Sequence, residues 1–332
     1  MKRNLIIAGV LIIGAVFTVA LIANQSPQPR QITIGMTYIP NVQFAPWYVA
    51  QEKGFFKELG MDVAFDYRMD IDALQLVATG QMDFAIAGGD QVITSRSQNI
   101  PVVYLLSLYA KFPPAVVALK NSGITKPQDL IGKQVGLPLY GTNLLAIKAI
   151  LNRAGIPETE VKLVDIGYTQ ISSLTSGRVD AVVGFANNEP LKLEQAGYQV
   201  TRIPAWDYFS LVGHGLITGE TTVKKNRKLV AKMVQATLKG MRYTLDHPEE
   251  SLAICFQYLK EIGPEQRETE KKVFRESLKL WENELTKTHG LGYSDLKAWE
   301  DSQQLMLEMG LIKRTMPVEK YVDRSFLDTI KQ

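Results

Sequence analysis

The residues of this 332-residue chain that could do chemistry lie in short loops, each directly after a run that reads as a strand. They are aromatic, amide, hydroxyl and carboxylate side chains, with no Lys or Arg among them. The candidate ligand-binding residues are Tyr38, Asn41, Phe44, Tyr67, Asp90, Tyr109, Tyr140, Thr142, Tyr168, Asn187, Asn188 and Glu189. Aromatic rings stack on the faces of a planar ring, and amides and carboxylates bond to its polar edge. The set therefore favours a planar, nitrogen-rich ligand.

Two blocks of alternating strands and helices position these loops, which predicts an α/β fold with mainly parallel sheets. The first block has strands at 32–36, 61–67 and 83–87 and helices at 44–59 and 71–79; the second has strands at 134–137, 161–166 and 180–184 and helices at 142–154 and 171–176. The segments Gly80–Asp83 and Gly177–Asp180 match at an offset of 97 residues. We interpret this as a duplication of two lobes, in which Asp83 and Asp180 have equivalent turn or cap roles.

Three further strand-like runs, at 102–108, 115–119 and 209–217, could carry the chain between the lobes as a hinge. Four helices are expected beyond them, at 229–245, 248–259, 265–285 and 294–309, and we expect this helical tail to return to the first lobe. The predicted domains are therefore 31–117 with 218–332 for lobe 1, and 118–217 for lobe 2. In such folds ligands bind at the carboxyl ends of the strands, which is where the candidate residues lie.

The N-terminus predicts export. A basic start at Met1–Asn4 precedes 19 uncharged, mostly apolar residues from Leu5 to Ala23 and a polar, proline-containing exit. Leu21 disfavours cleavage, so residues 1–30 fit either a signal peptide or an uncleaved membrane anchor. The body from about Gln31 is therefore expected to be extracytoplasmic.

Composition argues against several function classes. Lys plus Arg total 37 and Asp plus Glu 34, a net charge of +3 without a concentrated basic run, so nucleic acid is not an expected partner. The single cysteine, Cys255, rules out an internal disulfide, a cysteine-based zinc site and an iron–sulfur cluster. We expect no cofactor and no metal. No nucleophile motif is present, and His214, His247 and His289 lie outside the predicted ligand loops, so an enzyme is disfavoured.

The segment from Asn41 to Phe56, followed by Gly60 and by the Gly-x-x-Asp-Phe sequence of residues 80–84, resembles the substrate-binding proteins of bacterial ABC importers in the NMT1/THI5-like (thiamine-pyrimidine/sulfonate-binding) superfamily. The resemblance covers nearly all of the chain after Gln31. It implies a two-lobed, type II periplasmic-binding-protein-like fold that closes around its ligand. It also implies an ABC permease with its ATPase as partners, and we expect a monomer.

Within that superfamily, residues 38–46 and 186–190 are most similar to the riboflavin-importer branch. Asp90 departs from that branch, where a Glu is expected. A thiamine pyrimidine precursor is the alternative ligand, and a sulfonate- or nitrate-type anion the second. A membrane-anchored sensory module and a pyrimidine-synthase-like enzyme are the other functions considered, and the enzyme is the least favoured.

Overall fold

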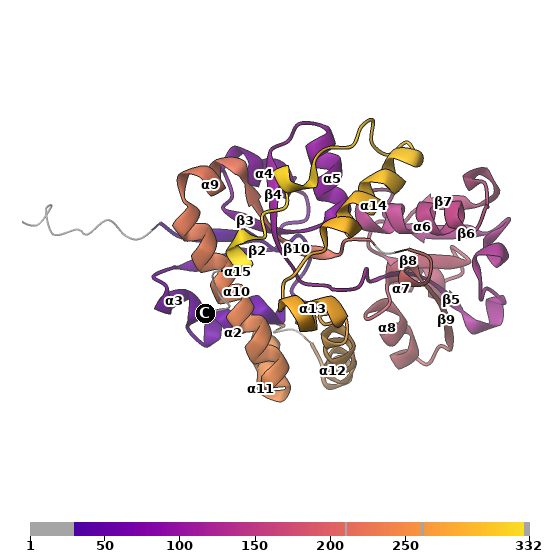
Figure 1. Ribbon diagram of the computed structural model, residues 1–332. Helices are drawn as coiled ribbons and strands as arrows, with labels where there is room; N and C mark the ends of the chain where they lie inside the picture. Colours follow the sequence, from indigo (N-terminus) through magenta and orange to yellow (C-terminus); the bar gives the residue numbers. More distant parts are fainter. Residues whose placement is uncertain (1–29, 210, 260–261, 329–332) are drawn as a thin grey trace, which may run out of the picture. The chain divides into compact units, whose positions relative to one another are not determined.

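Two five-stranded sheets, each flanked by helices, organise the chain (Figure 1). This computed structural model describes residues 30–209, 211–259 and 262–328. The chain divides into two units, Met1–Gln31 and Ile32–Gln332, and both sheets belong to the second. The first lobe contains, in spatial order, β2 (Val63–Asp66), β1 (Ile32–Gly35), β3 (Phe84–Gly88), β10 (His214–Gly219) and β4 (Val102–Ser107). The second contains β7 (Lys162–Asp165), β6 (Gln134–Leu137), β8 (Ala181–Phe185), β5 (Pro114–Leu119) and β9 (Val200–Pro204).

The two sheets have the same strand order and the same directions. In the first sheet β10 runs antiparallel to its neighbours β3 and β4, and β1, β2 and β3 pair in parallel. In the second, β5 is antiparallel to β8 and β9, and β6 pairs in parallel with β7 and β8. Each sheet is thus mainly parallel with one antiparallel strand, which confirms the predicted α/β class and agrees with a duplication.

The two aspartates singled out by the repeat make the same bond in the two lobes. Asp83 Oδ2 accepts from the backbone N–H of Thr33 at 3.0 Å, and Asp180 Oδ2 accepts from that of Gln134 at 2.8 Å. Each carboxylate, located just before the third strand of its block, satisfies an N–H in the first strand. The cap role therefore spans two strands and is not confined to one turn.

The helices between the strands include the four expected ones, one of them divided, and two that were not predicted, over Gly89–Ser97 and Glu189–Gln195. They are α2 (Ala45–Glu52), α3 (Phe55–Glu58), α4 (Ala73–Thr79) and α5 (Gly89–Ser97) in the first lobe, and α6 (Gly141–Arg153), α7 (Gln170–Thr175) and α8 (Glu189–Gln195) in the second. The helix expected over 44–59 is divided because Gly54 has a φ of 74°, a left-handed conformation that a continuous α-helix does not contain. Short 3-10 helices are η1 (Val42–Phe44), η2 (Lys120–Ser122), η3 (Pro127–Leu130), η4 (Glu158–Glu160), η5 (Ala205–Asp207) and η6 (Val318–Lys320).

The C-terminal part is helical, as expected, but contacts both lobes. Its helices are α9 (Glu220–Lys225), α10 (Arg227–Asp246), α11 (Pro248–Tyr258), α12 (Pro264–Leu278), α13 (Glu284–His289), α14 (Leu296–Glu308) and α15 (Ser325–Asp328). The helix expected over 265–285 ends at Leu278, because Trp281 is buried and Asn283 then caps α13 through a bond from the Thr286 N–H. Helices α10 and α11 pack on α2, whereas α12 packs on both η1 of the first lobe and α8 of the second.

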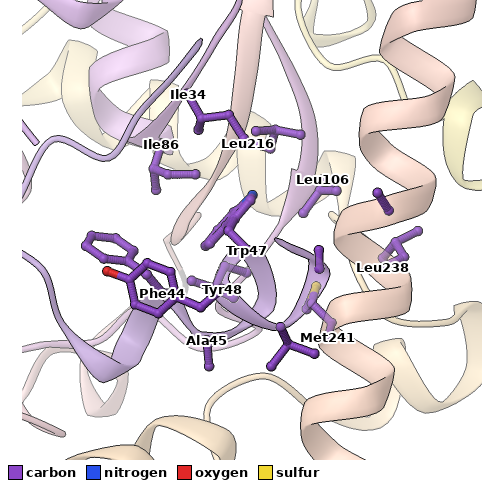
Figure 2. Packing of buried hydrophobic residues seen from close by; sticks show 14 of the residues in the cluster. Ile34, Phe44, Ala45, Trp47, Tyr48, Ile86, Leu106, Leu216, Leu238 and Met241 are labelled. Carbon is purple, nitrogen blue, oxygen red and sulfur yellow. The ribbon is translucent and has the colours of Figure 1, made fainter. Parts of the chain in front are cut away.

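The core of the first lobe forms where α2 lies between the sheet and α10. Trp47 is fully buried in a cluster that also contains Leu216 of the sheet and Met241 of α10 (Figure 2). The approach of α10 to α2 requires a glycine, since a Cβ on Gly240 would lie 2.0 Å from the carbonyl oxygen of Pro46. This packing fixes the start of α2, and with it the loop that carries Tyr38 to Phe44.

The chain passes between the sheets twice, after β4 and after β9. The described residues of these connections, 108–113 and 205–213, contain no strand, so the crossings are loops and not the expected crossing strands. The expected boundaries at 117/118 and 217/218 fall inside β5 and β10, and a boundary cannot divide a strand that pairs along its whole length with one sheet. Both boundaries therefore move toward the N-terminus.

The predicted export segment lies outside the described residues, apart from Arg30. Among the residues that the structure describes, no helix has the length and apolar character needed to cross a bilayer.

Candidate ligand-binding site

A cavity lies between the two lobes, at the carboxyl ends of the parallel strands. Its empty space, including the mouth that is open to solvent, is about 950 Å³. This is within the range of small-molecule sites. The first lobe and the connection after β4 contribute Met36, Thr37, Tyr38, Gln43, Phe44, Ile86, Gln91, Leu108, Tyr109 and His214. The second lobe contributes Pro138, Tyr140, Gly141, Thr142, Asn143, Tyr168, Gln170, Gly184, Phe185, Asn188 and Glu189.

Aromatic rings meet across the cavity. The ring centroids of Tyr38, from the first lobe, and Tyr168, from the second, are 5.7 Å apart, and those of Tyr140 and Tyr168 are 6.3 Å apart, both edge to face. Tyr140 is 55% and Tyr168 42% exposed, so these two side chains are available to a ligand. Deeper in the cavity, the Phe185 ring contacts those of Tyr109 and His214 at 6.4 and 5.3 Å.

A buried chain of polar groups joins the first lobe, the second lobe and the helical tail. Gln43 Oε1 accepts from the Tyr109 hydroxyl at 2.6 Å and from Asn187 Nδ2 at 2.9 Å. Asn187 Nδ2 also donates to Ser277 Oγ of α12 at 2.7 Å, and that hydroxyl donates to the carbonyl of Val273. Burial raises the pKa of Tyr109 above its ordinary value, so its hydroxyl remains a donor. The network couples the relative position of the lobes to η1.

A second direct contact between the lobes lies at the start of α5. Thr142 Oγ1 donates to Asp90 Oδ1, and both side chains are buried. Burial raises the pKa of Asp90 to about 6, and the bonds from Thr142 and from the backbone N–H groups of Asp90 and Gln91 offset part of this effect. Gly88 leaves the space for this pair, because a Cβ there would lie 2.3 Å from Asp90 Oδ1 and 2.5 Å from Thr142 Oγ1.

Glu189 is the carboxylate that lines the cavity, at the first position of α8. Its Oε2 accepts from the Phe185 N–H at 2.5 Å, and its Oε1 accepts from Asn188 Nδ2 at 3.0 Å. Burial raises its pKa, and the Phe185 bond, Lys192 and its place at a helix N-terminus act in the opposite direction. Gly184 makes room for it, since a Cβ there would lie 2.5 Å from Oε2.

Several buried polar atoms of lining residues have no partner within the described residues. They are Asn143 Oδ1, Asn188 Oδ1 and His214 Nδ1. Burial lowers the pKa of His214 to about 4, so the imidazole is neutral at pH 7. Buried polar atoms that lack a bond are costly in a folded protein. Asn143 Oδ1 and Asn188 Oδ1 lie on the second-lobe side of the cavity and His214 Nδ1 on the first-lobe side, where a ligand could bond to them.

Charge and metal chemistry are limited in this cavity. None of the described residues that line it is Lys or Arg. Across the part of the chain that the structure describes, no group of three or more His, Cys, Asp or Glu side chains is arranged to hold a metal ion. The cavity can stack an uncharged aromatic ligand and bond to its edge.

The structure brings eight of the twelve candidate residues into the cavity wall: Tyr38, Phe44, Tyr109, Tyr140, Thr142, Tyr168, Asn188 and Glu189. The other four lie outside it. Asn41 caps η1 through a bond from the Gln43 N–H, and the Tyr67 hydroxyl donates to that of Tyr48. Asp90 and Asn187 make the contacts between the lobes described above.

Sequence reasoning also missed lining residues, among them Gln43, Asn143, Phe185 and His214. The first three lie within or beside the predicted loops, and only their roles were not assigned. His214 is a different case, because β10 runs antiparallel and its amino end pairs with Gly88 at the carboxyl end of β3. A search restricted to the carboxyl ends of strands could not find it.

Two lobes of the same topology with an aromatic cavity between them define a substrate-binding protein of the periplasmic-binding-protein fold. Solved structures agree: the periplasmic aliphatic sulphonate-binding protein SsuA of Escherichia coli aligns with a TM-score of 0.68 at 14% identity, over 90% of this chain and 93% of that chain. This likeness concerns the fold alone. The family model described as NMT1/THI5 like matches residues 41–251. The chain belongs to this family, and the predicted resemblance is confirmed.

Relatives in the family include binding proteins and synthases. The riboflavin-binding protein RibY of Chloroflexus aurantiacus is 34% identical over 98% of both chains. A formylaminopyrimidine-binding protein of Halalkalibacterium halodurans is 30% identical, over 81% of this chain and 82% of that protein. The 4-amino-5-hydroxymethyl-2-methylpyrimidine phosphate synthase of Legionella pneumophila is 27% identical, over 68% of this chain and 73% of that protein.

Proposed function

We propose that this protein captures riboflavin in the cavity between its lobes, outside the cytoplasmic membrane, and delivers it to an ABC permease and its ATPase. The observation that carries the proposal is the cavity wall, in which Tyr38, Tyr140 and Tyr168 meet across the lobes and no described lining residue is Lys or Arg. A flat isoalloxazine ring stacks on such a wall. RibY, named as a riboflavin-binding protein, shares 34% identity over nearly the whole chain.

Closure of the lobes is the step that a permease would recognise. The Asn187–Gln43 and Thr142–Asp90 bonds already join the lobes, and a ligand stacked against Tyr38 and Tyr168 would add contacts to both. Ligand binding then favours the closed arrangement through contacts that an open arrangement lacks. The loops after β4 and β9 are the hinge in this proposal, with Tyr109 in the first of them. In this proposal a single chain is the unit that closes.

The N-terminal sequence supports the extracytoplasmic assignment. A basic start and a long apolar run precede the folded unit. The body thus functions on the outer side of the membrane, whether residues 1–30 are removed as a signal peptide or retained as an anchor.

An aminopyrimidine precursor of thiamine is the second candidate ligand. It is supported by the formylaminopyrimidine-binding relative at 30% identity and by the same aromatic wall. A sulfonate or nitrate receives less support, because a buried anion requires a compensating charge and the lining residues supply none. An enzyme also receives less support, because RibY and the formylaminopyrimidine-binding protein, which match more of this chain than the Legionella synthase, are named as binding proteins.

Fluorescence titration of the purified protein with riboflavin tests the proposal. Flavin fluorescence is quenched when the ring stacks on tyrosine, so saturable quenching at submicromolar concentration is expected. A titration with 4-amino-5-hydroxymethyl-2-methylpyrimidine, in which calorimetry measures the heat of binding, tests the second candidate. Absence of saturable flavin quenching would overturn the riboflavin assignment.

A further inference from the structure

The polar end of the cavity in the second lobe has a defined hydrogen-bonding direction. Asn143 Nδ2 donates to the Val183 carbonyl at 3.3 Å, and Asn188 Nδ2 donates to Glu189 Oε1 at 3.0 Å. Carbonyl and carboxylate oxygens only accept hydrogen bonds. Rotating either amide by half a turn would place its oxygen against another oxygen. Each asparagine is therefore held with its amide nitrogen toward the protein.

The amide oxygens of the same two asparagines have no hydrogen-bond donor. Asn143 Oδ1 and Asn188 Oδ1 are buried and accept no bond from any described residue, and both residues line the cavity. Their donors are bound to the end of β8 and the start of α8, the elements that form this wall. Asn143 reaches Val183 directly, and Asn188 is held by Glu189, which in turn accepts from the Phe185 N–H.

The neighbouring groups strengthen the same preference. The Glu189 carboxylate also accepts, and Gln170 Nε2 is directed to the same Val183 carbonyl as Asn143, at 3.4 Å. The wall thus presents oxygen acceptors, and no cation lies among its described residues. Groups on a ligand that donate N–H bonds suit this wall, whereas the oxygens of a sulfonate, which has no N–H, would face oxygen atoms.

We propose that Asn143 and Asn188 are the specificity-determining residues of this cavity and select heterocycles by their ring or amino N–H donors. This inference rests on the proposed function, because it concerns the ligand of the same cavity. For riboflavin, the donor from which they would accept a hydrogen bond is the ring N3–H. For the aminopyrimidine it would be the exocyclic amine.

A ligand series on the unmodified protein tests the proposal without any change to the fold. Riboflavin is compared with 3-methylriboflavin, which keeps the stacking surface and loses the N–H. We expect 3-methylriboflavin to bind about 10-fold or more weakly, since a buried acceptor is then left unpaired. Equal affinities would overturn the proposal.

Variants then assign the effect to the asparagines. Asn143→Ala and Asn188→Ala should each weaken riboflavin more than 3-methylriboflavin, so that the ratio of their dissociation constants falls toward one. Asn152→Ala is the matched control, because Asn152 lies exposed on the same helix α6 and should leave the ratio unchanged. A ratio that is unaltered in both cavity variants would show that another group reads the N–H and would overturn the assignment.

The same data separate this proposal from the riboflavin assignment. If riboflavin does not bind, the riboflavin assignment fails, and the series is repeated with 4-amino-5-hydroxymethyl-2-methylpyrimidine and its N,N-dimethylamino analogue. Discrimination between these two that is lost in the asparagine variants would support selection by N–H donors. Binding of octanesulfonate in place of all four heterocycles would overturn both proposals.

Discussion

Thr142 of the second lobe donates a hydrogen bond to Asp90 of the first, with 2.8 Å between Oγ1 and Oδ1. The two residues are 52 positions apart and each lies in the first turn of its helix. The buried Asp90 carboxylate therefore lies at the contact between the lobes. The groups that act on its pKa are the Thr142 hydroxyl and backbone N–H groups, and no cation is among them. Protonation of Asp90, with a pKa of about 6, therefore changes the charge at the contact between the lobes.

Asp90 should make the stability of the ligand-free protein fall as pH rises from about 4 to about 6. Burial raises its folded pKa to about 6, above the unfolded value of about 3.9, so the folded state holds a proton that the unfolded state has released. Asp90→Asn removes this dependence. Its Tm relative to the unmodified protein should rise over this pH range by on the order of 5 °C, measured by differential scanning fluorimetry. Parallel Tm profiles for the two proteins would contradict the assignment.

His214 should make the stability of the protein change with pH in the opposite direction. Burial lowers its folded pKa to about 4, below the unfolded value of about 6.5, so the unfolded state binds a proton that the folded state excludes. Stability from this group is present above pH 6.5 and is lost as pH falls toward 4. His214→Gln should therefore gain Tm relative to the unmodified protein as pH falls. A flat difference for His214→Gln would refute the prediction.

Tyr168→Leu should weaken riboflavin binding about 10-fold and reduce the quenching at saturation, because the stacking surface between Tyr38 and Tyr140 is lost. Tyr168 is 42% exposed, so Tm should change little. The matched control is Tyr198→Leu, a tyrosine of the second lobe with 38% exposure that does not line the cavity. Fluorescence titration measures both variants, and equal loss of affinity in the two would show that the effect is not local to the cavity.

Much of the fold could be predicted because its determinants are local. Alternating β-branched runs and glycine-terminated helices give the duplicated block, and β6 occupies the predicted residues 134–137. The aromatic loops likewise follow directly from strand ends, which is why Tyr38, Tyr140 and Tyr168 were found together. These features depend on a few neighbouring residues each.

The remaining parts of the site depend on tertiary packing. Asn187 was assigned to the ligand, yet its amide donates to Gln43 and Ser277, which are 144 and 90 positions away. The Tyr67 hydroxyl bonds to Tyr48 because α2 packs on the first sheet, where the Tyr48 ring contacts Phe65 of β2. No local pattern identifies such partners. His214 was missed because a strand's direction in a sheet is set by the other strands.

Asp83 and Asp180 provide a matched pair for the last prediction, because the duplication gives them the same partner in the two lobes. Asp83→Ala and Asp180→Ala each leave a strand N–H, that of Thr33 or Gln134, without its acceptor. A buried donor without a partner costs about 1–3 kcal/mol. Both variants should lower Tm by a few degrees, and Asp83→Ala by more, because Asp83 is buried and Asp180 only half-buried. The exposed Asp70→Ala is the control and should leave Tm unchanged.

Riboflavin affinity should stay within about 2-fold in all three variants, since neither strand aspartate lines the cavity. A variant that lost affinity while keeping its Tm would instead assign the aspartate to the ligand.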